Sequence, residues 1–312
     1  MPKFENFLQA VEYCDNVPYV KASEHGVPFE LEKDILIGTL LAPVVEKLKE
    51  YNTTISPSPF IFTSTSIQFN THLATFEERT KAIQLITYQW RKDNVFPALK
   101  GWRDELYPVY GPQGKPIFVI ERAAAALFGI STFGVHINAF VRDQGIIKMW
   151  VAKRASTKQT WPSVLDNCVA GGMPYNYSTK ETVIKECDEE ASIPESLASN
   201  ARSVSIITYY TKSKDGLQPE TEYIYDLELP VDYTPTPKDG EVECFYLWTL
   251  DEVKQSILNG DWKPNCSLVA LEFMMRHGYI TADNEPDYVD ISYRLHRRLD
   301  FPGPKKANEL KQ

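Results

Sequence analysis

The segment 167–193, NCVAGGMPYNYSTKETVIKECDEEASI, constrains the fold more than any other stretch, because it joins a glycine pair, a loop and a helix-start signal. Ser178 and Glu181 have the spacing of a capping box, in which a hydroxyl and a carboxylate satisfy free backbone N–H groups at a helix start. Apolar residues then recur at three- and four-residue steps, as on a face packed against a core. These residues are Val183, Ile184, Cys187 and Ala191. We therefore expect a helix that begins near residue 178.

Three glutamates of the same helix, Glu186, Glu189 and Glu190, are spaced i, i+3 and i+4. Like charges at these spacings repel one another, so the arrangement costs stability unless a cation lies among them. A solvated acidic face is the plain interpretation of such a run taken alone. The alternative is a site for a hard divalent cation such as Mg²⁺, which prefers carboxylate oxygens and commonly bridges to substrate phosphates.

The residues upstream favour the metal site. Gly171 and Gly172, a loop, and then KECDEEASI follow one another in an order that resembles the Nudix box, G-x5-E-x7-R-E-U-x-E-E-x-G-U with U aliphatic. On this resemblance Glu186, Glu189 and Glu190 match the three metal-binding glutamates of that motif. The resemblance thus implies Mg²⁺ or Mn²⁺ as the cofactor.

The same segment departs from the Nudix pattern at three positions. Lys185 replaces the usual arginine, Ser192 replaces the last glycine, and Tyr177 occupies the position of the early glutamate. The metal-binding part of the motif is therefore kept, while the loop 171–177 differs from the family pattern.

The resemblance extends over nearly the whole chain. Seven segments are similar to the two-domain Nudix proteins of fungi and plants, which are related to the Nudix portion fused to thiamine pyrophosphokinase in some fungi. These segments are WRDELYPVY, ERAAAALFGISTFGVHINAFV, LDNCVAGGMP, KECDEEASI, YDLELP, DGEVECFYLW and CSLVALEFMMRHGYI. This likeness, and not composition or spacing, implies hydrolysis of oxidised, toxic analogues of thiamine diphosphate, namely oxothiamine and oxythiamine diphosphate, to monophosphate and phosphate.

The charge of the chain bears on its partners. Its formal net charge is −9, and nucleic acids and anionic membranes both require a basic surface. The longest apolar run, residues 35–45, is also far too short to span a bilayer. We therefore expect a small-molecule diphosphate as the partner, with no nucleic acid and no membrane. The sequence predicts no oligomeric state.

The cysteines indicate a reducing compartment. There are five of them, and none form a C-x-x-C pair. An odd number without that spacing disfavours both a disulfide framework and a zinc site. The N-terminal segment also lacks the apolar core of a signal peptide. We expect a cytoplasmic protein.

The pattern of elements predicts an α/β fold, with an N-terminal α+β domain at residues 1–117 and a Nudix α/β/α sandwich at residues 118–312. In the first domain we expect a strand over residues 29–37 and a helix that starts at Thr75, where Thr75 and Glu78 form a second capping box. In the second domain residues 135–153 have the pattern of a hairpin.

The segment 101–110, GWRDELYPVY, combines charged and aromatic residues near this boundary. We interpret it as an aromatic strand with an Arg–carboxylate brace, since structural ion pairs resemble functional ones. A catalytic role is the alternative.

Further candidates flank the box. Arg154 and Lys158 lie in a basic loop, and they are either substrate-binding residues that hold phosphates or solvated surface charges. Gly171 and Gly172 are the other substrate-binding candidates. Glu241, which precedes a strand, is either a general base from a later loop or a surface carboxylate.

The resemblance implies a hydrolase in which Glu189, Glu190 or Glu241 acts as the catalytic base. Aromatic residues near the box are candidates for stacking on a heteroaromatic ring, although such residues often belong to the core or its rim; they are Trp161, Tyr175 and Tyr177. Two alternatives remain: a Nudix diphosphatase for a nucleoside diphosphate derivative, and a non-catalytic module that binds a phosphorylated ligand.

Overall fold

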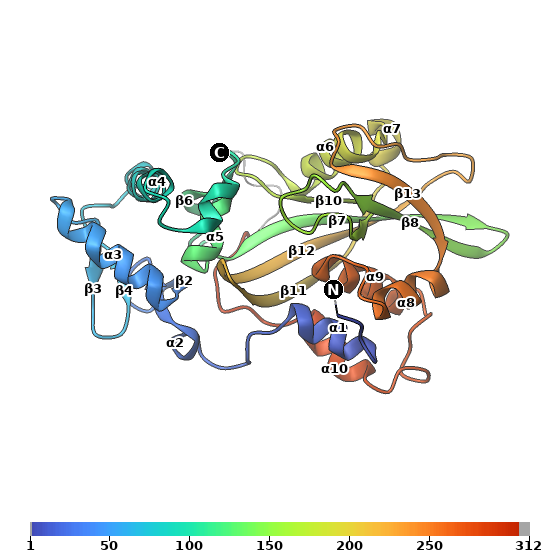
Figure 1. Cartoon of the computed structure of the whole chain (residues 1–312), viewed down its shortest axis with the longest axis horizontal. Coiled ribbons are helices and arrows are strands. Elements are labelled where there is room, and N and C mark those ends of the chain that lie inside the picture. The colour runs from blue at the N-terminus through green and yellow to red at the C-terminus, as the bar shows by residue number, and fades with distance from the viewer. Residues whose placement is uncertain (1, 306–312) are drawn as a thin grey trace.

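Two sheets with separate layers of helices form the two halves of the molecule in the computed structural model, which describes residues 2–305 (Figure 1). The first sheet has the strand order β2-β1-β4-β3. Its strands are β1 (Val27–Glu30), β2 (Leu36–Leu40), β3 (Phe60–Phe62) and β4 (Ile67–Phe69). The single strand expected over residues 29–37 is wrong: the chain turns back between β1 and β2, with Asp34 in the left-handed region at φ 66°. A short polar side chain tolerates that conformation, which period-two patterning does not reveal.

Helices and a second ribbon complete the first half. The helical segments are α2 (Ala22–His25), α3 (Ala42–Thr54), α4 (Phe76–Lys92), the 3₁₀ helix η1 (Pro97–Gly101) and α5 (Arg122–Phe128). The expected capping box of α4 is confirmed, because Thr75 and Glu78 satisfy each other's backbone N–H groups. Two further strands, β5 (Leu106–Tyr110) and β6 (Pro116–Glu121), pair with each other. One apolar cluster, which includes Phe29 and Phe118, packs these elements together.

The second half contains a mixed sheet of seven strands. Its main order is β11-β12-β7-β8-β13, with β10 paired to β7 and β9 to β8. The strands are β7 (Thr132–Asp143), β8 (Ile146–Arg154), β9 (Leu165–Asn167), β10 (Val169–Gly172), β11 (Arg202–Ser213), β12 (Gly216–Glu228) and β13 (Val242–Thr249). The expected hairpin is confirmed as β7 and β8, whose two-residue turn places Gln144 and Gly145 at positive φ.

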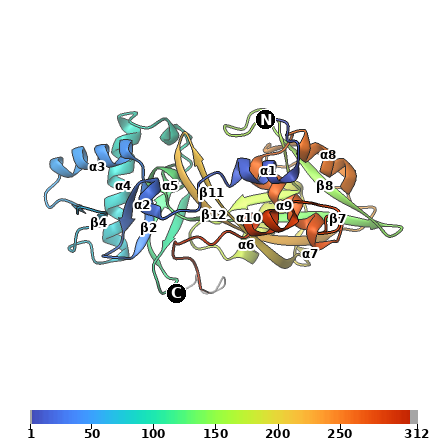
Figure 2. The same cartoon turned by 90° about the horizontal axis from the view of Figure 1, so that it is seen from below.

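Helices cover both faces of this sheet, which confirms the α/β/α sandwich (Figure 2). Alternate residues of a strand point to opposite faces. Val135 and Ile137 of β7 thus pack with the apolar side of one helix layer, while Phe140 packs with the other. The first layer is α6 (Thr179–Ala191) with α7 (Glu195–Ala198); the second is α1 (Phe7–Cys14), α8 (Leu250–Leu258), α9 (Pro264–Arg276) and α10 (Tyr288–Leu295). Within residues 2–305, no helix has the length and apolar character needed to cross a membrane.

The division at residue 117 stays a prediction, and packing shows how the chain crosses between the halves. Residue 117 lies inside β6, and α5 after it still packs in the first apolar cluster. At the other end, α1 belongs to the second half, because Phe7, Val11 and Cys14 are buried with α8 and α9. The N-terminal helix therefore belongs to the sandwich, although it precedes the first half in the sequence.

A buried ion pair ties the segment after α1 to the C-terminal part of the chain. Arg297 donates one hydrogen bond to Asp15, at 2.9 Å, and others to the carbonyls of Val17 and Pro18. Its guanidinium also lies 4.0 Å from the centre of the Tyr19 ring. Asp15 is 1% exposed, and Arg297 is its closer cation, since Arg294 lies 3.5 Å from its other oxygen.

Loss of this pair should destabilise the fold. We expect Arg297→Met to lower the free energy of unfolding by about 3–5 kcal/mol, because it removes the closer cation of a buried carboxylate. The neighbouring Arg298 is exposed, so Arg298→Met should change it by less than about 0.5 kcal/mol. Urea unfolding of both variants measures the difference, and equal effects would contradict the structural role of Arg297.

Candidate active site

Helix α6 is built as the sequence predicts. Ser178 caps it, with the Glu181 N–H donating to its hydroxyl and the Ser178 N–H donating to the Glu181 carboxylate. The helix ends at Ala191, and Ser192 follows with a left-handed backbone at φ 53°. Glycine adopts this conformation without strain, which is the physical reason for glycine at that position of the Nudix pattern. Serine keeps the turn here and donates a hydrogen bond to the Thr236 carbonyl.

The apolar side of α6 packs on the sheet and fixes the direction of its glutamates. Val183, Cys187 and Ala191 are completely buried in the cluster that contains β7. The glutamates consequently differ in solvent exposure: Glu190 is 8% exposed, whereas the Glu189 side chain is 47% exposed. The acidic face is therefore not a uniformly solvated surface.

Glu190 is held by the backbone of β10. Its Oε2 accepts a hydrogen bond of 2.9 Å from the Ala170 N–H. Burial raises the pKa of Glu190 well above its ordinary value, and the nearby charges of Asp166 and Glu186 raise it further. Within residues 2–305, its Oε1 accepts no hydrogen bond.

Glu186 packs directly over the glycine pair. A Cβ at position 171 would lie 2.4 Å from Glu186 Cδ, so any other residue there would displace this carboxylate. Burial raises the pKa of Glu186, and Lys185 partly opposes the effect. Gly172 is equally constrained, because a Cβ there would meet the Tyr107 hydroxyl. Steric contacts thus explain why both positions hold glycine. The role of the two glycines in binding substrate stays a prediction.

Lys185 lies between two of the three glutamates. Its Nζ is 3.0 Å from Glu186 Oε1 and 2.7 Å from Glu189 Oε2. The lysine therefore performs the charge-neutralising and orienting task that the arginine of the Nudix pattern suits. It leaves one oxygen of each glutamate without a partner among the residues that the structure describes.

The chemistry of these side chains suits a hard divalent cation, although among the described residues their oxygens do not all lie within 4.8 Å of one another. Glu186, Glu189 and Glu190 each offer a carboxylate oxygen, and Mg²⁺ or Mn²⁺ prefers such ligands with water in its remaining positions. The raised pKa values of Glu186 and Glu190 reflect crowded, buried negative charge that a cation relieves. These three residues are accordingly the ones that would hold the metal.

The basic loop between β8 and β9 is engaged with carboxylates. Arg154 binds Asp166 at 2.6 Å and also donates to the carbonyls of Thr160 and Trp161. Lys158 forms a 2.5 Å ion pair with Glu241.

Glu241 lies close enough to the helix for its charge to raise the pKa of Glu190. Although burial acts in the opposite direction, Lys158 lowers the pKa of Glu241 itself. The substrate-binding roles of Arg154 and Lys158, and the basic role of Glu241, stay predictions.

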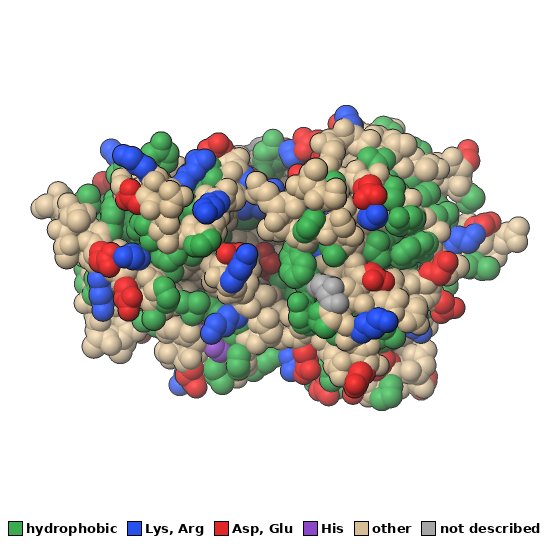
Figure 3. Space-filling view, viewed as in Figure 1, with side chains coloured by type: hydrophobic (Ala, Val, Ile, Leu, Met, Phe, Trp, Pro, Cys, Tyr) green, Lys and Arg blue, Asp and Glu red, His purple; other side chains and the backbone are tan. Residues whose placement is uncertain are grey.

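The first half contributes directly to the same region. The Tyr107 hydroxyl lies against Gly172, and the Tyr175 N–H donates to the Leu106 carbonyl at 2.8 Å. The expected brace exists, although its arginine is Arg122, which pairs with Glu105 at 2.8 Å and lies over the Tyr107 ring. The space-filling view shows the molecule hollowed where the two halves meet (Figure 3).

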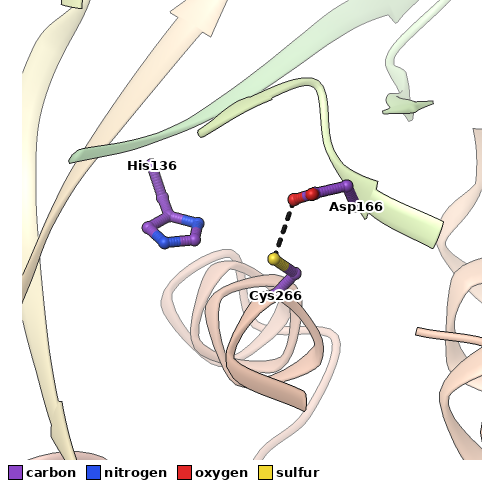
Figure 4. A group of neighbouring side chains, drawn as sticks. All are labelled: His136, Asp166 and Cys266. Atoms are coloured by element: carbon purple, nitrogen blue, oxygen red, sulfur yellow. Dashed lines mark hydrogen bonds between the residues drawn. The ribbon is translucent and has the colours of Figure 1, made fainter. Parts of the chain in front are cut away.

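A buried group of side chains on the α9 face of the sheet was not expected from the sequence. His136, Asp166 and Cys266 place potential metal-binding atoms within 4.8 Å of one another (Figure 4). Each already has a partner: the Cys266 thiol donates to Asp166 at 2.7 Å, and His136 Nδ1 lies 2.7 Å from Asn167 Oδ1. The interpretation of His136 as a satisfied core histidine therefore agrees with its contacts.

The signal for this group is present in the strand pattern. Glu220 and Glu222 alternate with Thr221 and Tyr223 along β12, so the two carboxylates share one face of a strand in the middle of the sheet. Two acidic residues on one face of a central strand indicate a polar interior. The alternation of the strand alone does not show whether that face is buried or exposed.

Comparison with known proteins agrees with this arrangement of a sandwich, a glycine pair and a glutamate-bearing helix. A family model described as a domain of unknown function (DUF4743) matches residues 6–132. An uncharacterized protein of Saccharomyces cerevisiae, YJR142W, is 34% identical, over 95% of this chain and 92% of its own length.

Two relatives from Arabidopsis thaliana carry the class name. Nudix hydrolase 24, chloroplastic, is 35% identical over 93% of this chain and 77% of that protein. Nudix hydrolase 20, chloroplastic, is 35% identical over 87% of this chain and 73% of that protein. The chain therefore belongs to the Nudix hydrolase family, and it is a hydrolase.

Two substitutions on α6 test the site. Glu190→Gln keeps the side-chain shape but removes a charged oxygen, so phosphate release from a diphosphate in Mg²⁺ should fall about 100-fold, a loss that supporting residues alone can cause at metal sites. Asp188→Asn is the matched control, because Asp188 is exposed and pairs with Lys238. Its rate should stay within about twofold of the wild type. Equal rates for Glu190→Gln and the wild type would contradict the assignment.

Proposed function

We propose that this Nudix hydrolase cleaves the diphosphate of oxidised, toxic analogues of thiamine diphosphate, giving a monophosphate and phosphate. The observation that carries the proposal is the crowding of Glu186 and Glu190 against the Val169–Gly172 backbone, where the Tyr107 hydroxyl also lies against Gly172. A diphosphate fits the carboxylates through a divalent cation. The choice of a thiamine-type ring rests on the segment resemblances described above.

Mg²⁺ or Mn²⁺ bound by the three glutamates would neutralise the diphosphate oxygens and favour ionisation of a bound water near neutral pH. The residues of the chain set the remaining conditions. Lys185 orients Glu186 and Glu189, while Ala170 orients Glu190. Burial of Glu186 and Glu190 excludes water and so strengthens the electrostatic interactions of these carboxylates.

Among the three candidate bases, Glu190 suits proton removal best. Glu189 pairs with Lys185 at 2.7 Å, and Lys158 lowers the pKa of Glu241, which weakens Glu241 as a proton acceptor. Glu190 has no cationic partner within residues 2–305, and burial raises its pKa, which makes it a stronger proton acceptor.

A nucleoside diphosphate derivative is the second candidate substrate. The glutamates of α6 favour it equally, because they respond to the diphosphate and not to the organic group.

All five cysteines are free thiols, which supports our further proposal of a reducing compartment such as the cytoplasm.

An assay of phosphate release separates the two candidate substrates. With Mg²⁺, the purified protein should hydrolyse oxothiamine and oxythiamine diphosphate with a higher kcat/KM than thiamine diphosphate, ADP-ribose or nucleoside triphosphates. The reason is that differential binding of the organic group sets kcat/KM. A preference for ADP-ribose would overturn the thiamine-type substrate and leave the family assignment intact.

A further inference from the structure

Three different metal-binding groups meet in the core, on the face of the central sheet that α9 covers (Figure 4). His136 comes from β7, Asp166 from β9 and Cys266 from α9. All three side chains are buried, and their imidazole nitrogen, carboxylate oxygen and sulfur lie within 4.8 Å of one another. Val135 and Ile137 of β7 pack toward α6, so His136 between them points to the opposite face. The group is therefore separate from the glutamates of α6.

The chemistry of this group differs from that of the α6 glutamates. A thiolate and an imidazole prefer a borderline-soft ion such as Zn²⁺, whereas Mg²⁺ binds mainly oxygen. A tetrahedral Zn²⁺ with bonds of about 2.0–2.3 Å holds its ligand atoms about 3.5 Å apart. Side-chain movements of about 1 Å would therefore bring the three atoms, which already lie within 4.8 Å of one another, to ligand positions.

Cys266 is turned toward a carboxylate that other residues hold in place. Its sulfur lies 2.7 Å from Asp166 Oδ1, which also accepts a hydrogen bond of 2.8 Å from the Asn167 N–H. The other oxygen of Asp166 accepts from Arg154 at 2.6 Å. An S–H group is a weak donor, so it contributes little to binding this carboxylate. A shared cation would bind both groups strongly.

The imidazole of His136 has the supporting contacts that metal-binding histidines require. Nδ1 lies 2.7 Å from Asn167 Oδ1, and Nε2 lies 3.6 Å from Glu222 Oε1. Asn167 is itself held, because its Nδ2 donates to the Asn138 side chain and to the Cys266 carbonyl. A metal-binding histidine almost always directs its other nitrogen at a carbonyl or carboxylate oxygen. Here both nitrogens face such an oxygen, so the ring is held whichever nitrogen binds the ion.

We propose that His136, Asp166 and Cys266 bind one Zn²⁺ ion as a structural site, distinct from the hard-cation site of α6. Cys266 binds as the thiolate and releases its proton to solvent. Water takes the fourth position of the tetrahedron. The ion joins β7, β9 and α9, so its binding free energy adds to the stability of the sandwich.

The proposal is independent of the substrate. It also departs from the sequence expectation, in which cysteine spacing disfavoured zinc. That spacing reports only ligands that are near one another in the chain, whereas Asp166 and Cys266 are brought together by the packing of α9 on β9.

Cobalt(II) tests the site directly, because Co²⁺ occupies zinc sites and a cobalt–thiolate bond absorbs in the near ultraviolet. The full chain is first freed of metal, and Co²⁺ is then added in excess Mg²⁺, which occupies the glutamates. The thiolate band should saturate at about one ion per chain, and Zn²⁺ should abolish it. Cys266→Ser should lose the band. Cys244→Ser is the matched control, because it removes a half-buried cysteine outside the group, and it should keep the band.

Thermal unfolding gives a second readout. It is measured in a background that carries Glu186→Gln, Glu189→Gln and Glu190→Gln, so that the α6 site takes no part. Zn²⁺ at about 100 times its Kd should raise the Tm by about 5 °C, since the ion binds only the folded chain. Adding Cys266→Ser to this background should remove most of the rise.

The outcomes decide the proposal without reference to hydrolysis. A wild type that shows no thiolate band overturns it, and so does a band that Cys266→Ser keeps or that Cys244→Ser loses. If Cys266→Ser does not fold by circular dichroism, His136→Gln takes its place and should weaken Co²⁺ binding at least about 10-fold. Unchanged Co²⁺ affinity in that variant also overturns the site. Failure to hydrolyse a thiamine-type diphosphate would bear only on the proposed function.

Discussion

The contact between α6 and the backbone of β10 is the constraint on which the rest of the site depends. Glu190 accepts a hydrogen bond from Ala170, and Glu186 occupies the space that the absence of a side chain at Gly171 provides. Both contacts require the helix to begin at Ser178 and to pack its apolar side on the sheet. The mutual repulsion of the glutamates is thus opposed by core packing and by Lys185, which leaves carboxylate oxygens free for a cation.

The two halves of the molecule supply different parts of this site. The sandwich provides the glutamates, while the first half brings Tyr107 and the Glu105–Arg122 pair to the glycine pair. Docking of β5 on the loop after Gly172 fixes this relationship through the backbone. The proposed function thus draws its metal-binding glutamates from the sandwich and neighbouring side chains from the first half, and one catalytic motif can serve different substrates when its surroundings differ.

Features that depend on neighbours in the chain were predictable from the sequence, and features that depend on distant partners were not. The capping boxes at Ser178 and Thr75 and the β7–β8 hairpin follow from local spacing and are confirmed. The turn at Asp34 was missed because a left-handed residue leaves no period in the sequence. The buried group of His136, Asp166 and Cys266 joins residues as far apart in the chain as Asp166 and Cys266, so no local pattern encodes it.

The central claim is that the three glutamates of α6 hold a divalent cation, and electron paramagnetic resonance of Mn²⁺ tests it most directly. Titration of Mn²⁺ with wild-type protein should deplete the free-ion signal with about one or more ions bound per chain, since crowded carboxylates are hard-cation ligands. A variant with glutamine at positions 186, 189 and 190, shown by circular dichroism to be folded, should leave the signal unchanged. Equal depletion by the two proteins would contradict the account.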